Sequence, residues 1–376
     1  METSSPRSNG SSDPVVHEGL EGVVAAATRL SRVDGAAGRL TIAGYAVGEL
    51  APRRSFEAVA YLLFNDRLPS PAEERAYARS LAAHSALEPL TLSLLGQAAQ
   101  AAPIDALRLG AASLSTRATS PERLLGALPT IVATHARLAA GQPPLTPDPA
   151  HTRAESFLYL LRGERPSPAE VRALDTYWNT VSDHGLNAST FTARVIASTG
   201  SDIGSAIEGA LGALKGPLHG GAPGPALEAL RRLLAQGGDL TQATRAWAEA
   251  ELRAGRRLMG FGHRVYRVRD PRADVLQAAA TQLLAGSDLL ARAQEHETAV
   301  LETLARLKPN RSIATNVEFY TALLLHGLGF STELFTPVFA LGRLAGWLAH
   351  YAEQQKTGRL IRPDARYVGA ERRGVG

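Results

Sequence analysis

Apolar residues recur along most of the chain with the spacing of an amphipathic α-helix. In the segment 55–65, the apolar residues at 56, 59, 60 and 63 stand at i, i+3, i+4 and i+7 and therefore share one helical face. A similar stripe of leucines runs through the segment 223–236. Alternating stretches are short and few, and "GRLTIAGYAV" (38–47) is the best of them. The pattern predicts a mainly α protein.

Several of these helices have recognisable starts. Ser70 and Ser167 are each followed by proline and, three residues on, by Glu73 or Glu170. This order is typical of a capping box with proline in the first turn. Ser120 is followed by Pro-Glu in a looser version of the same start. We therefore expect helices to begin directly after these three serines.

Two glycine- and proline-rich stretches interrupt the helical pattern. The first is "KGPLHGGAPGP" (215–225), and the second is "LMGFGHRVYRVRDPR" (258–272). Glycines on both sides of a histidine allow the backbone to approach a ligand closely. Glycine-rich ends also suit a block that moves against the rest of the chain. The predicted organisation is a disordered segment 1–17, a large domain of residues 18–219 and 326–376, and a smaller mobile domain of residues 220–325.

Composition narrows the class of protein. Of the 376 residues, 45% are hydrophobic and 20% are charged, as in ordinary globular proteins. The absence of cysteine excludes disulfides and thiolate metal sites. No apolar run approaches the length of a membrane span, and the polar N-terminus lacks the apolar core of a secretory signal, so a cytoplasmic location is expected. The net charge of +4 comes without long basic runs, which argues against nucleic acid as a partner.

Three of the ten histidines differ from the others in their context. His184 opens "HGLNASTFTAR", His219 lies in "GPLHGGA", and His263 lies in "GFGHRVY". The other seven are expected to be surface or core residues. The three are too far apart in sequence for a local metal motif, and no acidic cluster accompanies them, so no metal site is expected.

Loop histidines and arginines without a metal suit the condensation of an enolate with a keto acid. Removing a proton next to a thioester carbonyl requires a carboxylate base and a donor to the carbonyl oxygen. Addition to a ketone requires a second donor for the oxygen that becomes an alkoxide. The carboxylates of the keto acid require arginines, whose fork geometry matches them.

Longer motifs carry a resemblance to a known family. They are "GLEGVVAAATRLSRVDGAAGRL" (19–40), "DHGLNASTFTARVIASTGSDIGSAIEGALGALKGPLHGGA" (183–222), "GFGHRVYRVRDPR" (260–272), "FTPVFALGRLAGWLAHYAEQ" (335–354) and "RPDARYVG" (362–369). In these motifs the chain resembles citrate synthases of the short bacterial type, in register from about residue 18 to 370. The resemblance implies a large helical domain, a smaller mobile domain and an obligate homodimer. The implied reaction, part of the tricarboxylic acid cycle, joins acetyl-CoA to oxaloacetate, with coenzyme A as co-substrate and no other cofactor.

The resemblance also assigns roles to individual residues. His219 would polarise the carbonyl of acetyl-CoA, His263 would protonate the carbonyl of oxaloacetate, and Glu318 would be the base. The remaining residues would bind substrates. His184, Arg272 and Arg343 would hold oxaloacetate, Arg362 would reach into the neighbouring subunit's site, and Arg267, with Arg256 and Arg257, would contact coenzyme A phosphates.

Glu318 departs from the family pattern. It stands in "TNVEFYTA" (315–322) where the family has aspartate, and its side chain is longer by one methylene, about 1.5 Å. With the usual glutamate pKa of about 4.3, we expect it to be ionised at neutral pH.

Two alternatives remain beside a working citrate synthase. One is a 2-methylcitrate synthase that uses propionyl-CoA, since one methylene changes binding by only about 1–3 kcal/mol. The other is a weakly catalytic ligand-binding paralogue.

Overall fold

The computed structural model describes residues 15–115, 119–220, 223–263, 265–311, 313–370 and 373. The expected disordered segment 1–17 lies mostly outside these residues, as do residues 221 and 222 of the first glycine-rich stretch.

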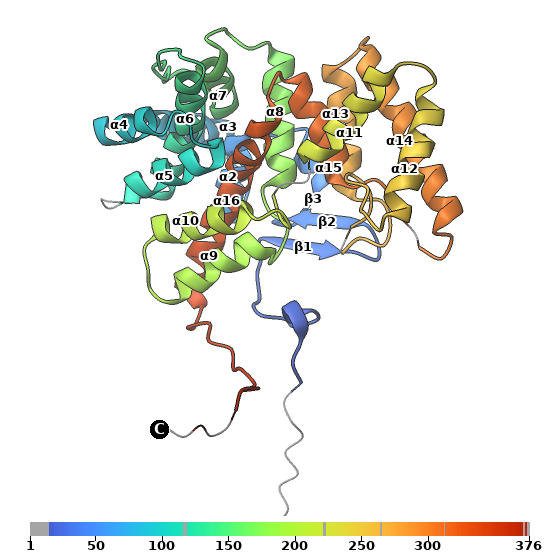
Figure 1. Cartoon of the computed structure of the whole chain (residues 1–376). Helices are drawn as coiled ribbons and strands as arrows, with labels where there is room; N and C mark the ends of the chain where they lie inside the picture. Colours follow the sequence, from blue (N-terminus) through green and yellow to red (C-terminus); the bar gives the residue numbers. More distant parts are fainter. Residues whose placement is uncertain are drawn as a thin grey trace, which may run out of the picture.

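The mainly α prediction is confirmed (Figure 1). The α-helices are α1 (Val47–Leu50), α2 (Phe56–Asn65), α3 (Pro71–Ala83), α4 (Pro89–Gln97), α5 (Pro103–Ser115), α6 (Pro121–Ala139), α7 (Arg153–Arg162), α8 (Pro168–Val181), α9 (Ala188–Ser198), α10 (Ile203–Leu214), α11 (Pro223–Gln236), α12 (Leu240–Arg253), α13 (Pro271–Leu283), α14 (Asp288–Leu307), α15 (Val317–Gly327) and α16 (Phe335–Thr357). Two short 3-10 helices are η1 (Glu18–Leu20) and η2 (Thr332–Leu334).

The predicted helix starts are confirmed. Ser70 and Ser167 form capping boxes at α3 and α8, each with the glutamate three residues later. Ser55 caps α2 by accepting a hydrogen bond from the backbone N–H of Ala58. The side chain of Ser120 caps α6 by accepting a hydrogen bond from the backbone N–H of Arg123. These ends follow from local chemistry, because each cap satisfies a backbone donor that the helix leaves unpaired.

A small antiparallel sheet lies beside the helices, with strand order β1-β2-β3. Its strands are β1 (Ser31–Asp34), β2 (Arg39–Ile42) and β3 (Tyr45–Ala46). The turn between β1 and β2 packs directly under the second glycine-rich stretch. A Cβ atom on Gly35 would lie 2.3 Å from the carbonyl oxygen of Val265, so only glycine fits there.

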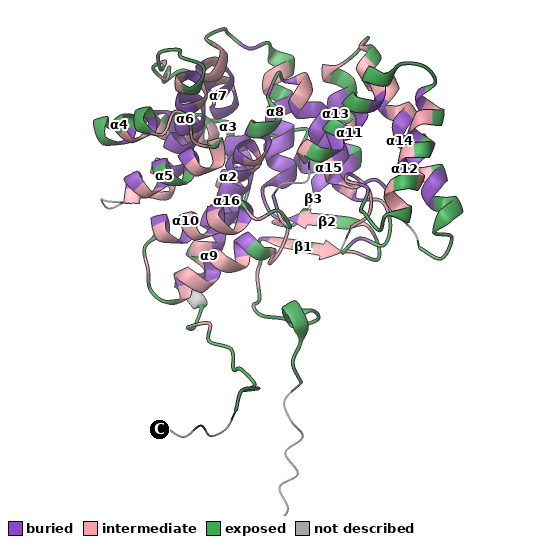
Figure 2. Cartoon of the chain, viewed as in Figure 1, coloured by how far each residue is buried: buried purple, intermediate pink, exposed green. Residues whose placement is uncertain are grey.

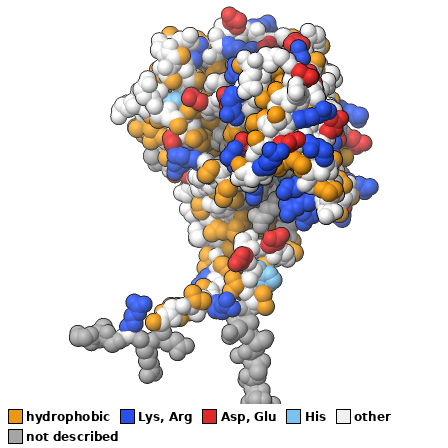
Figure 3. Space-filling model, turned by 45° about the vertical axis from the view of Figure 1, so that its right-hand side comes forward, with side chains coloured by type: hydrophobic (Ala, Val, Ile, Leu, Met, Phe, Trp, Pro, Cys, Tyr) orange, Lys and Arg blue, Asp and Glu red, His pale blue; other side chains and the backbone are white. Residues whose placement is uncertain are grey.

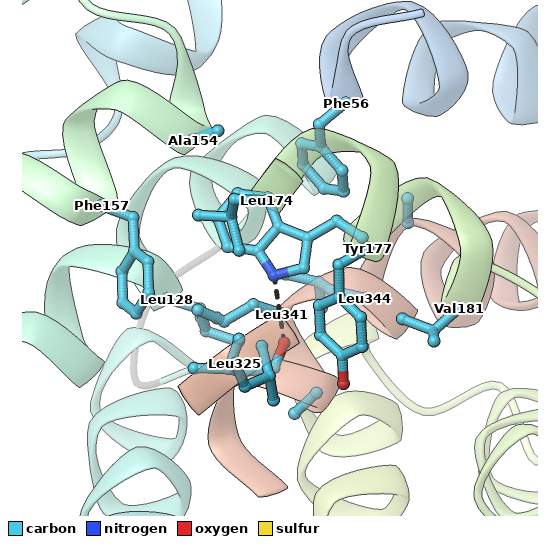
Figure 4. Packing of buried hydrophobic residues seen from close by; sticks show 14 of the residues in the cluster. Phe56, Leu128, Ala154, Phe157, Leu174, Tyr177, Val181, Leu325, Leu341 and Leu344 are labelled. Carbon is cyan, nitrogen blue, oxygen red and sulfur yellow. Dashed lines mark hydrogen bonds between the residues drawn. The ribbon is translucent and has the colours of Figure 1, made fainter. Parts of the chain in front are cut away.

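The core is one extensive apolar cluster to which both halves of the chain contribute (Figure 2). Trp178 of α8 and Trp347 of α16 are fully buried in it. The indole N–H of Trp178 donates to the carbonyl oxygen of Val338 at 3.1 Å, which satisfies its buried donor. Figure 4 shows Leu174 and Leu344 among the apolar side chains packed there. This packing fixes α8 against α16, and both helices lead to the site described below.

Helices α11 to α15 lie together on one side of the molecule (Figure 1). In this group, Ala248, Leu258, Val300 and Leu304 form a separate small apolar cluster. Helices α11, α13 and α15 instead contribute to the main core. The division of the chain at residues 220–325, and the movement of that range as a separate domain, stay predictions. No helix in the described part of the chain is both long and apolar enough to cross a membrane.

Candidate active site

His184 lies in the turn between α8 and α9. Asn187 ends this turn by capping α9, and Gly185 has a positive φ of 59° that suits glycine. The Nε2 atom of His184 lies 3.1 Å from the hydroxyl of Tyr266, and its ring centroid is 5.8 Å from that of His263. Burial lowers the pKa of His184 well below its usual value, and the nearby cations lower it further. The ring is therefore neutral at pH 7.

His263 lies in the loop that leads to α13. Its Nδ1 atom accepts hydrogen bonds from the backbone N–H groups of Val265 at 3.0 Å and Tyr266 at 3.1 Å. Burial, followed by the charge of Arg272, lowers the pKa of His263 to about 4. Because Nδ1 is an acceptor in this neutral ring, the proton is carried by Nε2. Nε2 lies 3.3 Å from Nη2 of Arg272, which can only donate, so in this tautomer the two groups do not hydrogen-bond to each other.

His219 follows α10 in the first glycine-rich stretch and faces α9. Its Nε2 atom accepts from the backbone N–H of Ser189 at 3.3 Å and lies 2.8 Å from the hydroxyl of the same serine. That hydroxyl also accepts from the indole N–H of Trp347 at 3.1 Å. Burial, followed by the charge of Arg343, lowers the pKa of His219 to about 4. The neutral ring therefore carries its proton on Nδ1.

Two buried arginines supply the positive charge of the site. Arg272 is 4% exposed and is paired with Asp270, whose Oδ2 lies 2.8 Å from Nη2. Arg343 of α16 is 2% exposed and donates to the carbonyl oxygen of Val181. Burial lowers its pKa to about 10, which Asp183 opposes. Within the described residues, no carboxylate lies within 4 Å of the Arg343 guanidinium, so this buried cation lacks an ion-pair partner.

Glu318 is the second residue of α15. Asn316 caps this helix, and its Oδ1 accepts from the Glu318 N–H at 2.9 Å. The side-chain amide of Asn316 donates to the carbonyl oxygen of Gly262 at 2.7 Å, which ties α15 to the His263 loop. Burial raises the pKa of Glu318 to about 7, although Arg272 opposes the shift. The expectation of an ordinary glutamate pKa is therefore wrong, because burial disfavours the charged form.

Together these groups form one compact chemical arrangement. Three neutral imidazoles and the carboxyl group of Glu318 lie around Arg343 and the Arg272–Asp270 pair. In His219 and His263, backbone N–H groups donate to one ring nitrogen, which places the proton on the other. Such a set can bind a dicarboxylate, donate to two oxygens and remove a proton. Among the described residues, no group of three His, Asp or Glu side chains is close enough to hold a metal ion.

The other predicted binding arginines lie outside this arrangement. The Arg362 side chain is 79% exposed on the extended chain after α16, and its Nη1 lies 3.9 Å from Oδ1 of Asp364. Arg256 pairs with Glu251 at 2.7 Å on the surface, and Arg257 and Arg267 are exposed. Figure 3, with the side of α12 and α14 turned forward, shows many Lys and Arg side chains there. The roles of these four arginines stay predictions.

Sequence reasoning gave no role to several residues that shape the site. Tyr266 and Asp270 lie inside the quoted motif, yet their contacts with His184 and Arg272 arise only in the folded chain. Ser189 supports His219 across 30 residues of sequence. Asn316 could have been recognised, because an asparagine before an apolar helical pattern indicates an N-cap.

Comparisons with known proteins agree on one family. The family described as "Citrate synthase, C-terminal domain" matches residues 19–364. A citrate synthase of Haloferax volcanii is 38% identical over 369 residues, which cover 93% of this chain and 95% of that protein. A 2-methylcitrate synthase of Mycobacterium tuberculosis is 37% identical over 371 residues, covering 96% of this chain and 92% of that protein.

Solved structures are similar over nearly the whole fold. The citrate synthase from Thermotoga maritima has a TM-score of 0.85 at 34% identity, covering 96% of this chain and 98% of that chain. The citrate synthase from Thermoplasma acidophilum, solved as a ternary complex with carboxymethyl coenzyme A and oxaloacetate, has a TM-score of 0.88 at 30% identity. It covers 96% of this chain and 98% of that chain.

Proposed function

The chain belongs to the citrate synthase family, and we propose that it joins acetyl-CoA to oxaloacetate and releases citrate and free coenzyme A. Membership makes it an enzyme, a transferase of the condensing type. The choice of an anionic substrate rests on one observation. Arg343 is a buried cation without an ion-pair partner in the described residues, beside Arg272 and a neutral imidazole. Burying a charge is costly unless it is paired, so an anionic ligand is the natural partner.

Oxaloacetate would be held through its two carboxylates. Arg272 and Arg343 offer guanidinium groups, which form bidentate pairs with carboxylates. His184 would bind the same substrate. In a homodimer, Arg362 of one subunit would complete the site of the other. The ketone oxygen would accept a hydrogen bond from the protonated Nε2 of His263.

Acetyl-CoA would be activated by an acid–base pair. The Nδ1–H of His219 would donate to the thioester carbonyl, because Nε2 already accepts from Ser189. The carboxylate of Glu318 would remove a proton from the methyl group and generate an enol or enolate. Arg267, with Arg256 and Arg257, would hold the phosphates of coenzyme A at the exposed edge.

The new bond would form between the CH2 carbon of the enolate, which was the methyl carbon of acetyl-CoA, and the ketone carbon of oxaloacetate. As this bond forms, the ketone oxygen would take the proton from Nε2 of His263, and the proton removed by Glu318 would restore His263 before the next turnover. Water would then hydrolyse the thioester, which releases citrate and the thiol of coenzyme A. No resident cofactor takes part in this scheme.

Propionyl-CoA is a second candidate donor, and its product would be 2-methylcitrate. The similarity to a 2-methylcitrate synthase of Mycobacterium tuberculosis, at 37% identity over nearly the full length, favours testing it. The two donors differ by one methylene, which an apolar pocket distinguishes by about 1–3 kcal/mol. Only a comparison of rates separates them.

The test is release of the coenzyme A thiol from acetyl-CoA and propionyl-CoA, each with and without oxaloacetate. We expect oxaloacetate-dependent release that is about 10-fold or more faster with acetyl-CoA. Faster release from propionyl-CoA would identify a 2-methylcitrate synthase. Absence of release with both donors, from protein that binds oxaloacetate, would point to the ligand-binding paralogue.

A further inference from the structure

Tyr266 contacts three of the groups proposed to act on oxaloacetate, namely His184, His263 and Arg272. Its ring centroid is 4.8 Å from that of His263 and 5.6 Å from that of His184. The guanidinium carbon of Arg272 lies 5.9 Å from the same ring, over its face. The ring is buried, at 3% exposure, so its position is determined by these neighbours.

The polar atoms of Tyr266 also contact both imidazoles. The hydroxyl lies 3.1 Å from Nε2 of His184, and the backbone N–H donates to Nδ1 of His263 at 3.1 Å. One residue therefore constrains two histidines that come from different loops. A hydrogen bond at Nε2 restricts the orientation of an imidazole ring.

We propose that Tyr266 is a positioning residue for oxaloacetate, whose hydroxyl holds the ring of His184 in the orientation that binds the substrate carboxylate. The inference rests on the proposed function, since it assigns His184 to oxaloacetate. The hydroxyl also joins two parts of the chain. His184 precedes α9, whereas Tyr266 precedes α13, within the range 220–325 predicted to move.

The loop that carries Tyr266 is itself held from the opposite side. The backbone N–H of Arg267 donates to the carbonyl oxygen of Gly35 at 2.9 Å, in the turn between β1 and β2. Gly35 has no room for a side chain against Val265. The sheet therefore supports the loop while the hydroxyl of Tyr266 reaches across to His184.

The variant Tyr266→Phe removes the hydroxyl and keeps the ring, so it isolates this contact. We expect the dissociation constant and KM for oxaloacetate to rise about 10-fold, the upper range for one hydrogen bond. The KM for acetyl-CoA should stay within about 2-fold, because His219 does not contact Tyr266. Calorimetric titration with oxaloacetate and steady-state kinetics measure these values.

An NMR measurement and a control variant distinguish a positioning effect on His184 from a general loss of stability. Long-range ¹H–¹⁵N spectra of the histidine rings, with His184 assigned from a His184→Asn variant, should show a shifted Nε2 resonance in Tyr266→Phe. The matched control is Tyr61→Phe, which removes a hydroxyl that hydrogen-bonds Glu73 far from the site. This control should leave the oxaloacetate affinity and the His184 resonance unchanged.

The outcomes distinguish this inference from the function on which it rests. Failure of the wild-type protein to bind oxaloacetate would overturn the proposed function. Binding by the wild type, with equal affinity and an unshifted His184 resonance in Tyr266→Phe, would overturn the role of Tyr266. A parallel loss of affinity for both substrates would also contradict it, because a positioning effect on His184 is confined to oxaloacetate.

Discussion

At the scale of residues, the site depends on how burial changes the charge of each group. The pKa values of His219 and His263 fall to about 4, so both rings remain neutral donors in the physiological range. Glu318 changes in the opposite sense, and its pKa of about 7 leaves it only partly ionised at neutral pH. The same desolvation that lowers the pKa of the imidazoles raises that of the carboxylate. The glutamate thus has a pKa near the value that suits a general base.

The first prediction concerns pH. Glu318 acts as a base only when it is ionised, and it becomes protonated as the pH falls below its raised pKa of about 7. We therefore expect kcat/KM for acetyl-CoA to fall about 10-fold per pH unit below pH 7. Bound oxaloacetate adds negative charge and keeps the apparent pKa at 7 or above. The measurement is a profile from pH 5 to 9 at constant ionic strength. An acid limb near pH 4.5 would show an unperturbed carboxylate or another base.

The length of the Glu318 side chain gives a second prediction. Asn316 fixes the backbone of this residue through its cap and its bond to Gly262, so the main chain cannot advance to compensate for a shorter side chain. Glu318→Asp withdraws the carboxylate by about 1.5 Å, and misplacement by about 1 Å can cost on the order of 100-fold. We expect kcat to fall at least about 10-fold.

The control for this variant is Glu333→Asp, which makes the same change on an exposed residue and should leave kcat unaltered. A rise in kcat for Glu318→Asp would contradict the account. It would mean that the pocket retains a shape suited to aspartate, the residue that the family pattern has at this position.

At the scale of elements, the N-terminal caps of α13 and α15 position Arg272 and Glu318 in the same way. Asp270 caps α13 and accepts from the N–H of Arg272 at 3.0 Å, and Asn316 caps α15 and accepts from the N–H of Glu318 at 2.9 Å. In each case the functional residue is the second of its helix, so the cap fixes its backbone directly. Asp270 also accepts from the backbone N–H of Val317 at 3.3 Å, which joins the two starts.

Asp270→Asn tests this element. Asparagine caps a helix as well as aspartate does, so the variant keeps the cap but removes the charge that pairs with buried Arg272. Breaking a buried pair costs about 3 kcal/mol or more in the free energy of unfolding, and oxaloacetate affinity should change with it. Urea unfolding and calorimetry measure both quantities.

Asp239→Asn is the matched control for that prediction. Asp239 caps α12 on an exposed surface, where its side chain accepts from the backbone N–H of Gln242. The change should alter stability by no more than about 0.5 kcal/mol and leave ligand binding intact. Equal effects of the two substitutions would mean that the charge of Asp270 has no special role.

Sequence patterns predicted the elements better than the contacts between them. The capping boxes of Ser70 and Ser167 were predictable because cap and helix are only a few residues apart. The bridge between Phe261 and Thr315 was not, because it joins loops that only the packing of α13 against α15 brings together. The pKa of Glu318 was missed for the same reason, since burial is a property of the folded chain.

At the scale of the whole molecule, the site joins the two sides of the fold. His184, His219 and Arg343 come from the side of α9, α10 and α16, whereas His263 and Glu318 come from the group α11 to α15 (Figure 1). Arg362 belongs to neither side of the site and lies on the exposed chain after α16. We propose that a second subunit is its partner.

Complementation tests this use of Arg362. Arg362→Ala and His263→Ala homodimers should each be nearly inactive, whereas mixed dimers should contain one intact site and regain up to about half of the wild-type activity per dimer. Differently tagged subunits, co-expressed and purified through both tags, provide the mixed dimers. Inactive mixed dimers of confirmed composition would show that Arg362 serves its own subunit.

Glu318 is tested as the base most directly by thiol release from acetyl-CoA in the variant Glu318→Gln, measured beside oxaloacetate binding. Glutamine keeps the size of the side chain and cannot accept the methyl proton. We expect turnover to fall by about 10²–10⁴-fold, the usual contribution of a general base, while oxaloacetate still binds. Wild-type turnover in Glu318→Gln would contradict this role and would require a different base.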